Sequence, residues 1–333
     1  MKCVVTGASG HIGNVLIRKL LEKNYEVKAF VLESENIDYL KELPIEICYG
    51  DVRDLESLKQ AFNGSDVVFH LAGIIDIGTV NKKFIYSINV DGTKNVLKAC
   101  KEERVKKLVY TSSVHAIPEK PKDEIIEETY EFSEDKVKGL YAKTKATATK
   151  YLLENVSKDN LPEIIIVHPS GVIGPFEYIT SNLGQLIIDC ANKKIGAYLE
   201  GGYNFVDVRD VAKGIVLAME KGKNGECYIL AGNKVSVKEL MKEIEKITNV
   251  KMPSFKIARW FAYATGFLSE IYYKIVKQKP LFTSYAVYTL GTNCNFSIEK
   301  AKTELGYNIR PIEQTLKDTV EWFKKQGKIK ENK

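Results

Sequence analysis

The chain has 333 residues, which is enough to bury a large core and to form two lobes. Hydrophobic residues make up 44% and charged residues 28%, and the net charge of +6 comes from lysines scattered along the sequence. No basic cluster is interleaved with aromatic residues, so the sequence argues against nucleic-acid binding. The longest apolar stretch, 260–268, is too short to span a bilayer, and the chain opens on a predicted strand, so we expect neither a membrane span nor a signal peptide.

The cysteines are widely separated, and none forms a pair at metal-binding spacing. This distribution predicts free thiols in a reducing compartment, and therefore a cytoplasmic protein with no disulfide framework and no bound metal. The six residues are Cys3, Cys48, Cys100, Cys190, Cys227 and Cys294.

The N-terminal segment reads as a strand, a glycine turn and a helix. An apolar run at 3–6 is followed by Gly7, Gly10 and Gly13, and then by 14–24, where apolar residues recur at helical spacing. Such glycines allow a tight bend, the close approach of a pyrophosphate and close helix–strand packing, while the helix N-terminus offers unpaired N–H groups. A second strand ends at Glu33, where a carboxylate can accept from a ribose hydroxyl. The pattern predicts a dinucleotide site.

Short apolar runs then alternate with helical segments, which predicts an α/β fold with a doubly wound parallel sheet. Ligands of such sheets bind at the carboxyl ends of the strands. The alternation ends near residue 174, and a helix is predicted at 237–247. We therefore expect a dinucleotide-binding domain over 1–173, with 205–235 returning to it, and a mainly substrate-binding lobe over 174–333. The predicted strands are 3–6, 27–32, 45–49, 67–71, 107–112, 164–168 and, returning late, 227–230.

Tyr141 and Lys145 lie four residues apart in a segment predicted to be helical through 154, so both side chains lie on one face. A nearby cation favours the phenolate, and lowering a tyrosine pKa by about three units takes roughly 4 kcal/mol. Tyr141 is then suited to exchange a proton with a substrate oxygen. Lysine-rich helices contain this spacing by chance, but here it follows a fifth strand that ends in the hydroxyl-bearing run 111–113.

Several motifs together resemble the extended short-chain dehydrogenase/reductases of the NAD-dependent epimerase/dehydratase superfamily. Within it, the chain most resembles the dihydroflavonol reductase-like and 3β-hydroxysteroid dehydrogenase-like branch. The resemblance implies a Rossmann-type sheet, a smaller, mostly C-terminal α/β substrate lobe and an enzyme acting on CH–OH groups. The motifs are TGASGHIG (6–13), GDV (50–52), HLAG (70–73), INVDGT (88–93), YTSSV (110–114), YAKTK (141–145), HPSGVIGP (168–175), FVDVRDVAKG (205–214) and KAKTELGY (300–307).

Residue by residue, the resemblance implies that Ser113, Tyr141 and Lys145 are catalytic. It implies that Ser112 is the alternative to Ser113 and contacts the substrate together with Tyr203. Asn89 is expected to hold the backbone. The implied cofactor-binding residues are Gly7, Ser9, Gly10, His11, Ile12, Gly13, Glu33, Asp51, Val52, Leu71, Ala72, Gly73, Lys145, His168, Pro169, Ser170, Gly171 and Val172.

The cofactor and the substrate are predicted from positions where related enzymes differ. NADPH-dependent relatives usually carry an arginine where Leu32 stands, and the following Glu33 repels a 2′-phosphate, so we expect NAD, with NADP left open. Nucleotide-sugar enzymes commonly have an arginine at the position of Tyr203 and a histidine at that of Asp207, so the sequence disfavours a diphosphate substrate. An aromatic-rich C-terminal lobe suits a hydrophobic small molecule.

The leading prediction is an NAD(P)-dependent oxidoreductase that interconverts a secondary alcohol and a ketone on a bulky steroid- or flavonoid-like substrate. The alternative is a nucleotide-sugar epimerase or dehydratase, and a third hypothesis is a non-catalytic dinucleotide-binding sensor, which the intact Ser113, Tyr141 and Lys145 oppose. Segment 257–277 is predicted to be a lid over the substrate, or alternatively to lie in a membrane interface. A homodimer is common in the superfamily.

Overall fold

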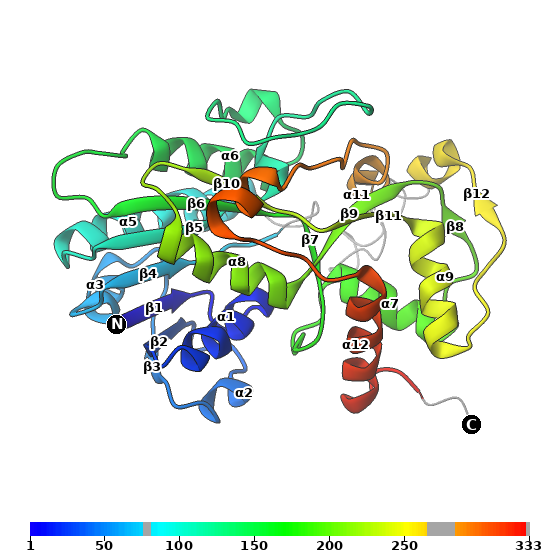
Figure 1. Cartoon of the computed structure of the whole chain (residues 1–333), viewed down its shortest axis with the longest axis horizontal. Coiled ribbons are helices and arrows are strands. Elements are labelled where there is room, and N and C mark those ends of the chain that lie inside the picture. The colour runs from blue at the N-terminus through cyan, green and yellow to red at the C-terminus, as the bar shows by residue number, and fades with distance from the viewer. Residues whose placement is uncertain (76–80, 265–283, 331–333) are drawn as a thin grey trace.

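A computed structural model describes residues 1–75, 81–264 and 284–330. Figure 1 shows a large parallel sheet between two layers of helices and, beside it, a smaller part that holds α7, α9, α11 and α12. The predicted α/β class and the Rossmann-type sheet are confirmed.

The seven strands of the large sheet lie in the order β3-β2-β1-β4-β5-β6-β10, and every neighbouring pair is parallel. Each predicted strand is confirmed, with its ends displaced by at most one residue. The strand order reverses direction between β1 and β4, the position at which open sheets of this kind bind nucleotides. The strands are β1 (Lys2–Thr6), β2 (Glu26–Val31), β3 (Glu46–Tyr49), β4 (Val67–His70), β5 (Lys107–Thr111), β6 (Glu163–Pro169) and β10 (Cys227–Leu230).

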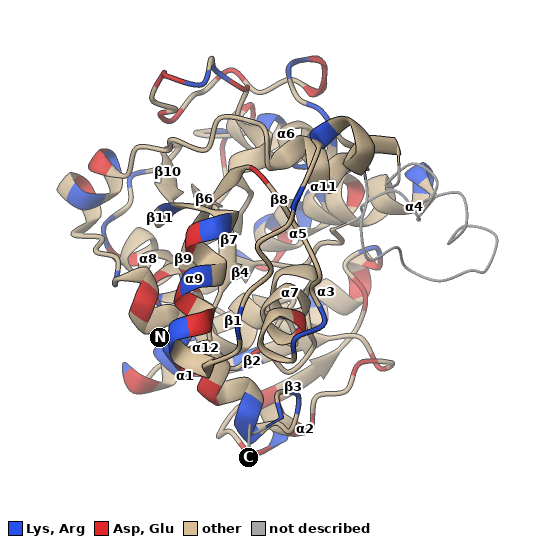
Figure 2. Cartoon of the chain, turned by 90° about the vertical axis from the view of Figure 1, so that its right-hand side faces the viewer, with Lys and Arg blue, Asp and Glu red and all other residues tan. Residues whose placement is uncertain are grey.

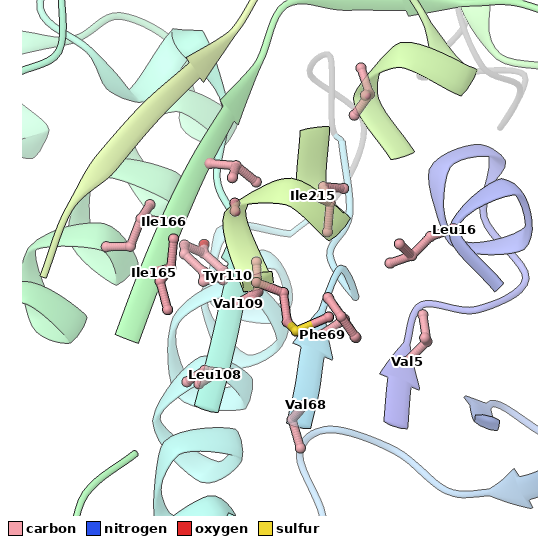
Figure 3. Packing of buried hydrophobic residues seen from close by; sticks show 14 of the residues in the cluster. Val5, Leu16, Val68, Phe69, Leu108, Val109, Tyr110, Ile165, Ile166 and Ile215 are labelled. Atoms are coloured by element: carbon pink, nitrogen blue, oxygen red, sulfur yellow. The ribbon is translucent and has the colours of Figure 1, made fainter. Parts of the chain in front are cut away.

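Helices cover both faces of this sheet. On one face α1 (His11–Glu22) packs against α8 (Val208–Lys221), and on the other α5 (Gly92–Glu102) lies between α3 (Leu55–Phe62) and α6 (Leu140–Leu153). All four residues of β4 and of β10 are buried, as expected for strands covered on both sides. Figure 3 shows side chains of β1, β4, β5 and β6 packed in the core together with Leu16 of α1 and Ile215.

The smaller part has a core of its own, built on two small sheets. β9 (Gly202–Asp207) pairs in parallel with β7 (Gly171–Ile173) and antiparallel with β11 (Asn233–Ser236), and β8 (Tyr198–Leu199) pairs with β12 (Lys256–Ile257). Helix α9 begins after Ser236, which forms a reciprocal capping box with Glu239. The helices here are α7 (Asn182–Ala191), α9 (Val237–Thr248), α11 (Ser284–Thr289) and α12 (Ile312–Lys325).

The segment 205–235 differs from its prediction. Only α8 and β10 belong to the large sheet and its helices, whereas β9 and β11 form the second sheet. The chain therefore passes from the small sheet to the large one and back. The reason is local: β9 ends at Asp207, whose side chain caps α8 by accepting from the Arg209 N–H.

The remaining elements are short connectors. They are α2 (Asp38–Lys41), α4 (Lys82–Tyr86), two 3₁₀ turns (Val114–Ala116 and Glu134–Lys136) and two π turns (Ser87–Asp91 and Ala301–Leu305).

The surface of the protein carries both basic and acidic residues (Figure 2). Figure 2 shows basic and acidic residues interspersed around the molecule. Across 1–75, 81–264 and 284–330, no helix has both the length and the apolar character needed to cross a bilayer.

The predicted lid or interface segment, 257–277, lies outside the described residues from 265 onward. All six cysteines are free thiols, as predicted.

Candidate active site

The glycine turn is held by close backbone contacts with the next strand of the sheet. Gly7 has a φ of +68°, and a Cβ there would lie 2.7 Å from the backbone nitrogen of Ala72, just after β4. A Cβ on Gly13 would lie 2.2 Å from the Gly7 carbonyl oxygen, so both positions exclude any side chain. The turn leads into α1, and the N-cap residue of this helix is Gly10. Because glycine has no side chain, it provides no capping hydrogen bond to the first backbone N–H groups of the helix. This cradle fits a pyrophosphate.

The acidic residue that reaches this turn is Glu35. Its carboxylate accepts from the Ser9 hydroxyl at 2.7 Å and from the Leu32 N–H at 3.3 Å. Glu33, which the sequence placed at the ribose, is exposed and has no such contact. The chain continues for two residues beyond Glu33 before it turns back toward Ser9, so Glu35 is the carboxylate that lies beside the turn, and the role of Glu33 at the ribose stays a prediction.

The next predicted cofactor residues have structural partners. Asp51 forms an ion pair with Arg53 whose hydrogen bonds hold the pKa of the Asp51 carboxyl below its usual range. Val52 is buried against Gly92 of α5. The His11 imidazole bonds the Pro175 carbonyl at 2.9 Å, which ties the start of α1 to the connection that follows β7.

The end of β5 brings the predicted catalytic residues together. The Lys145 ammonium donates to the Thr111 carbonyl at 2.7 Å and lies 4.8 Å from the Tyr110 ring centroid. Tyr141 lies close enough to Ser113 for the serine hydroxyl to favour the ionised phenol. Tyr141 and Lys145, one helical turn apart on α6, therefore both lie at the end of β5. No direct hydrogen bond joins these two side chains among the described residues.

Lys145 also lies next to the strand that contacts the glycine turn. A Cβ built on Gly73 would lie 3.5 Å from the Lys145 Nζ and 3.2 Å from the Asn89 Oδ1. Asn89 in turn accepts from the Ile74 N–H at 2.8 Å and donates to Thr144 at 3.0 Å, which confirms its expected backbone-holding role. Lys145, one of the predicted catalytic residues, and the glycine turn thus both contact the segment that follows β4.

Protonation differs from the expectation that Lys145 lowers the pKa of Tyr141. Burial raises the pKa of Tyr141 to about 12, and the hydrogen bond from Ser113 opposes the shift without overcoming it. Burial also lowers the pKa of Lys145 to about 7, because desolvation disfavours the charged ammonium. The phenol is therefore protonated at neutral pH, and the cation that was expected to ionise it is itself weakened by desolvation.

Ser112 and Ser113 have different partners. The Ser112 hydroxyl is buried and bonds the Thr149 hydroxyl of α6 at 2.7 Å. The Ser113 hydroxyl accepts from the His115 N–H at 3.2 Å and is shared with Tyr141. Successive residues of an extended segment point to opposite sides, and the Ser112 side chain points into α6. This contact does not favour Ser112 as a substrate contact, which stays a prediction.

The segment predicted to bind cofactor after β6 mainly joins the two sheets. His168 is buried, bonds the Ser113 carbonyl at 3.0 Å and stacks on Phe132, while Ser170 donates to Asn204 of β9 at 2.7 Å. A Cβ on Gly171 would lie 2.5 Å from the Tyr203 ring, so glycine makes room for that ring. Pro169 ends β6, and Val172 lies within β7. These contacts join the second sheet to the end of β6.

A residue that the sequence reasoning missed is His115. Its Nε2 lies 2.6 Å from the Tyr203 hydroxyl, and its ring lies 6.4 Å from that of Tyr141, centroid to centroid. Burial lowers the pKa of His115 to about 4. In the sequence, only its position indicates a role for His115: it lies two residues after Ser113, and residues that follow a strand lie at the carboxyl edge of the sheet, where ligands bind.

His115 and Tyr203 line a cavity. Its walls combine aromatic and aliphatic side chains with polar and charged ones, among them Glu119, Lys138 and Asn293. The apolar and aromatic residues include Val114, Ile126, Val137, Tyr285, Tyr288 and Phe296.

The fold and the site define a Rossmann-type dinucleotide enzyme with a serine, a tyrosine and a lysine at one strand end. The sequence model of the NAD dependent epimerase/dehydratase family matches residues 3–231, and the chain belongs to this family. NAD is accordingly its cofactor, as predicted. The glycine cradle, the Glu35 carboxylate and Lys145 are the groups of this structure that fit a bound dinucleotide.

Known proteins resemble the chain over nearly its whole length. A Synechocystis sp. protein assigned as a dihydroflavonol 4-reductase is 32% identical, covering 98% of this chain and 95% of its own. The mouse sterol-4-alpha-carboxylate 3-dehydrogenase (decarboxylating) is 29% identical over 97% and 91% of the two chains. The crystal structure of gox2253 has a TM-score of 0.86 at 34% identity, with 98% and 99% covered. The predicted superfamily and branch are confirmed.

Proposed function

We propose that this enzyme interconverts a secondary alcohol and a ketone on a bulky hydrophobic substrate of steroid- or flavonoid-like size. The observation that carries the proposal is a cavity lined in part by aromatic and aliphatic side chains and by His115, whose ring lies 6.4 Å from that of Tyr141, centroid to centroid. Aromatic and aliphatic side chains in such a wall suit contact with a hydrophobic ring system. Relatives named as a sterol dehydrogenase and as a ketoreductase, from mouse and from Stigmatella aurantiaca, support this substrate class.

We further propose the roles of the residues at the end of β5. Tyr141, protonated at neutral pH, donates its proton to the substrate oxygen when a ketone is reduced, and accepts it back in the reverse direction. Ser113 donates a hydrogen bond that stabilises negative charge on the phenol or the substrate oxygen. Lys145 holds the ribose side of the cofactor, and bound NAD supplies or accepts the hydride.

A nucleotide-sugar epimerase or dehydratase shares this fold, and two residues argue against it. Tyr203 has no charge with which to bind a diphosphate, and its hydroxyl is hydrogen-bonded to His115. Asp207, at the histidine position of those enzymes, is buried in ion pairs with Arg209 and Arg310.

A substrate panel tests the proposal. Purified protein is given NADH and steroid, flavonoid and smaller cyclic ketones, and we expect NADH consumption that the Tyr141→Phe variant lowers by about 10²- to 10⁴-fold. NADH affinity, measured by its fluorescence, should stay unchanged in that variant. Tightly held cofactor without net consumption, together with conversion of a UDP- or GDP-sugar, would overturn the proposal in favour of the epimerase class.

A further inference from the structure

The Ser9 residue of the glycine turn is held by two side chains that follow β2. Its hydroxyl donates to the Glu35 carboxylate at 2.7 Å, and its backbone carbonyl accepts from the Tyr39 hydroxyl at 2.5 Å. Tyr39 lies in α2, 30 residues after Ser9 along the chain. Burial raises the pKa of Tyr39 to about 12, and the Glu35 carboxylate adds to the shift, so the hydroxyl keeps its proton at neutral pH and acts as the donor.

These contacts fix the peptide plane between Ser9 and Gly10. On one side the Ser9 carbonyl accepts from Tyr39, and on the other the Gly10 N–H donates to the Gly7 carbonyl at 3.1 Å. A peptide unit is planar, so two hydrogen bonds at its opposite edges oppose its rotation. The restraint matters here because glycine has no Cβ to limit that rotation.

The orientation of this peptide decides what the start of α1 presents to a ligand. The first N–H groups of a helix have no partner within it, and they attract an anion such as a pyrophosphate. The backbone ladder of α1 begins with the Asn14 N–H, which donates to the Gly10 carbonyl at 3.0 Å. Rotation of the Ser9–Gly10 peptide would reorient the N–H groups before Asn14, so a bond that opposes the rotation keeps them available for the anion.

The Tyr39 ring is held in turn by the smaller part of the protein. It stacks on the Tyr178 ring, with the centroids 3.9 Å apart and the ring planes at 5°. Tyr178 lies in the connection from β7 to α7, and its ring makes a T-shaped contact with Trp322 of α12. The Tyr178 hydroxyl accepts from the Arg18 guanidinium of α1 at 3.4 Å. Segments that are distant in sequence therefore hold the ring whose hydroxyl reaches Ser9.

We propose that Tyr39 is a positioning residue for the dinucleotide: its hydroxyl holds the glycine turn in the form that binds the pyrophosphate, and Tyr178 holds Tyr39. Neither residue needs to touch the cofactor for this. The smaller part of the protein then contributes to cofactor affinity through Tyr178, although the glycine cradle belongs to the large sheet. The inference concerns cofactor binding alone and does not depend on the substrate proposed above.

Equilibrium binding to the purified protein, without substrate, tests the role of the hydroxyl. Tyr39→Phe keeps the ring and removes only the hydroxyl, so we expect the dissociation constants of NADH and ADP-ribose to rise about tenfold. Adenosine, which lacks the pyrophosphate, should bind the variant within about twofold of the wild type, whereas a general loosening of the site would weaken all three ligands. NADH fluorescence gives the first constant, and displacement of NADH gives the other two. Wild-type affinity for ADP-ribose, or equal weakening of ADP-ribose and adenosine, would overturn the proposal.

A matched control is Tyr25→Phe. Tyr25 is also a partly buried tyrosine and lies immediately before β2, but its hydroxyl donates to Glu220 of α8 at 3.3 Å. Its loss should leave all three dissociation constants within about twofold of the wild type. A tenfold weakening of ADP-ribose in this variant too would show that the effect is not specific to the bond with Ser9, and would overturn the assignment.

A double-mutant cycle tests whether Tyr178 acts through Tyr39. Tyr178→Leu removes the stacked ring and should raise the NADH dissociation constant about threefold, while Tyr178→Phe, which can still stack, should restore most of the affinity. In the Tyr39→Phe background, Tyr178→Leu should cause no further loss, because the hydroxyl that the ring positions is already absent. Additive losses in the double variant would overturn the role of Tyr178.

Discussion

On the cofactor side of the site, backbones meet one another: Gly7 lies against Ala72, and Gly13 against the Gly7 carbonyl, with no space for a Cβ. On the proposed substrate side, side chains meet: the His115 imidazole and the Tyr203 phenol come from two sheets and hydrogen-bond beside a cavity of mixed aromatic and polar lining. Both sides lie at the carboxyl edge of the same parallel sheet. The difference is that the cofactor side depends on the absence of side chains and the substrate side on their chemistry.

The two sides should therefore respond to different substitutions. Adding a single methyl group should be enough to damage the cofactor side, whereas the substrate side should tolerate changes of shape better than the loss of a hydrogen-bonding atom. The four predictions below test this contrast.

The largest effect is expected at the glycine turn. Gly13→Ala places a methyl group 2.2 Å from the Gly7 carbonyl oxygen, so the turn has to open. We expect NADH affinity to fall by at least about 100-fold, equivalent to about 2.7 kcal/mol, together with a lower melting temperature. Gly196→Ala is the control, since a Cβ there has no neighbour within 4 Å. Normal NADH binding by Gly13→Ala would show that the close contact between Gly13 and the Gly7 carbonyl is not needed for cofactor binding.

Lys145→Met should lower turnover by about 10²-fold or more, because the ammonium at the end of β5 is lost. In the absence of NAD the same variant should be more stable than the wild type at pH 7. The Lys145 pKa falls from 10.5 to about 7 on folding, so the unfolded chain binds more protons over this range. Wild-type stability should then rise with pH from 7 toward 10, by up to about 1.4 kcal/mol per unit.

Urea denaturation at pH 7 and pH 9 measures the effect. The stability difference between the wild type and Lys145→Met should shrink at the higher pH, while Lys143→Met, on the same helix and only partly buried, should show no such trend. If the stability difference between the two proteins does not depend on pH, folding does not lower the pKa of Lys145.

Cofactor choice should depend on Glu35 more than on Glu33. Glu35→Gln removes the negative charge beside Ser9, so the affinity for NADPH relative to NADH should rise about tenfold. Glu33→Gln, at an exposed position, should change this ratio by less than about twofold. Fluorescence titrations with both cofactors provide the comparison, and a larger effect of Glu33→Gln would restore the position predicted from the sequence.

The smallest effect on turnover is expected from Ser112→Ala. Its hydroxyl bonds Thr149 inside the fold, so the free energy of unfolding should fall by about 1 kcal/mol while turnover changes by less than about twofold. Ser113→Ala should lower turnover by about 10²-fold, because the hydrogen bond to Tyr141 is lost. NADH oxidation with an active ketone and thermal denaturation distinguish the two variants, and equal losses of turnover would contradict the separate partners of these serines.

Much of the cofactor half was predictable because its signals are local. Continuous apolar runs placed all seven strands of the sheet to within one residue at each end. The glycine spacing of the turn and the four-residue spacing of Tyr141 and Lys145 need only a few neighbouring residues to be recognised. In these segments a single periodicity, of strand or helix, decides which side chains share a face.

What the tertiary structure decided depends on contacts between distant segments. Glu35 lies beside the glycine turn because the loop after β2 folds back onto Ser9. Tyr203 meets His115 across 88 positions of the chain through a hydrogen bond that no sequence spacing encodes. The raised pKa of Tyr141 likewise follows from burial, which the sequence of one helix does not contain. Sequence alone therefore determined the sheet, the dinucleotide turn and the family, since these are local patterns. Packing decided the protonation and hydrogen bonding of the site, because desolvation and long-range contacts exist only once the chain has folded.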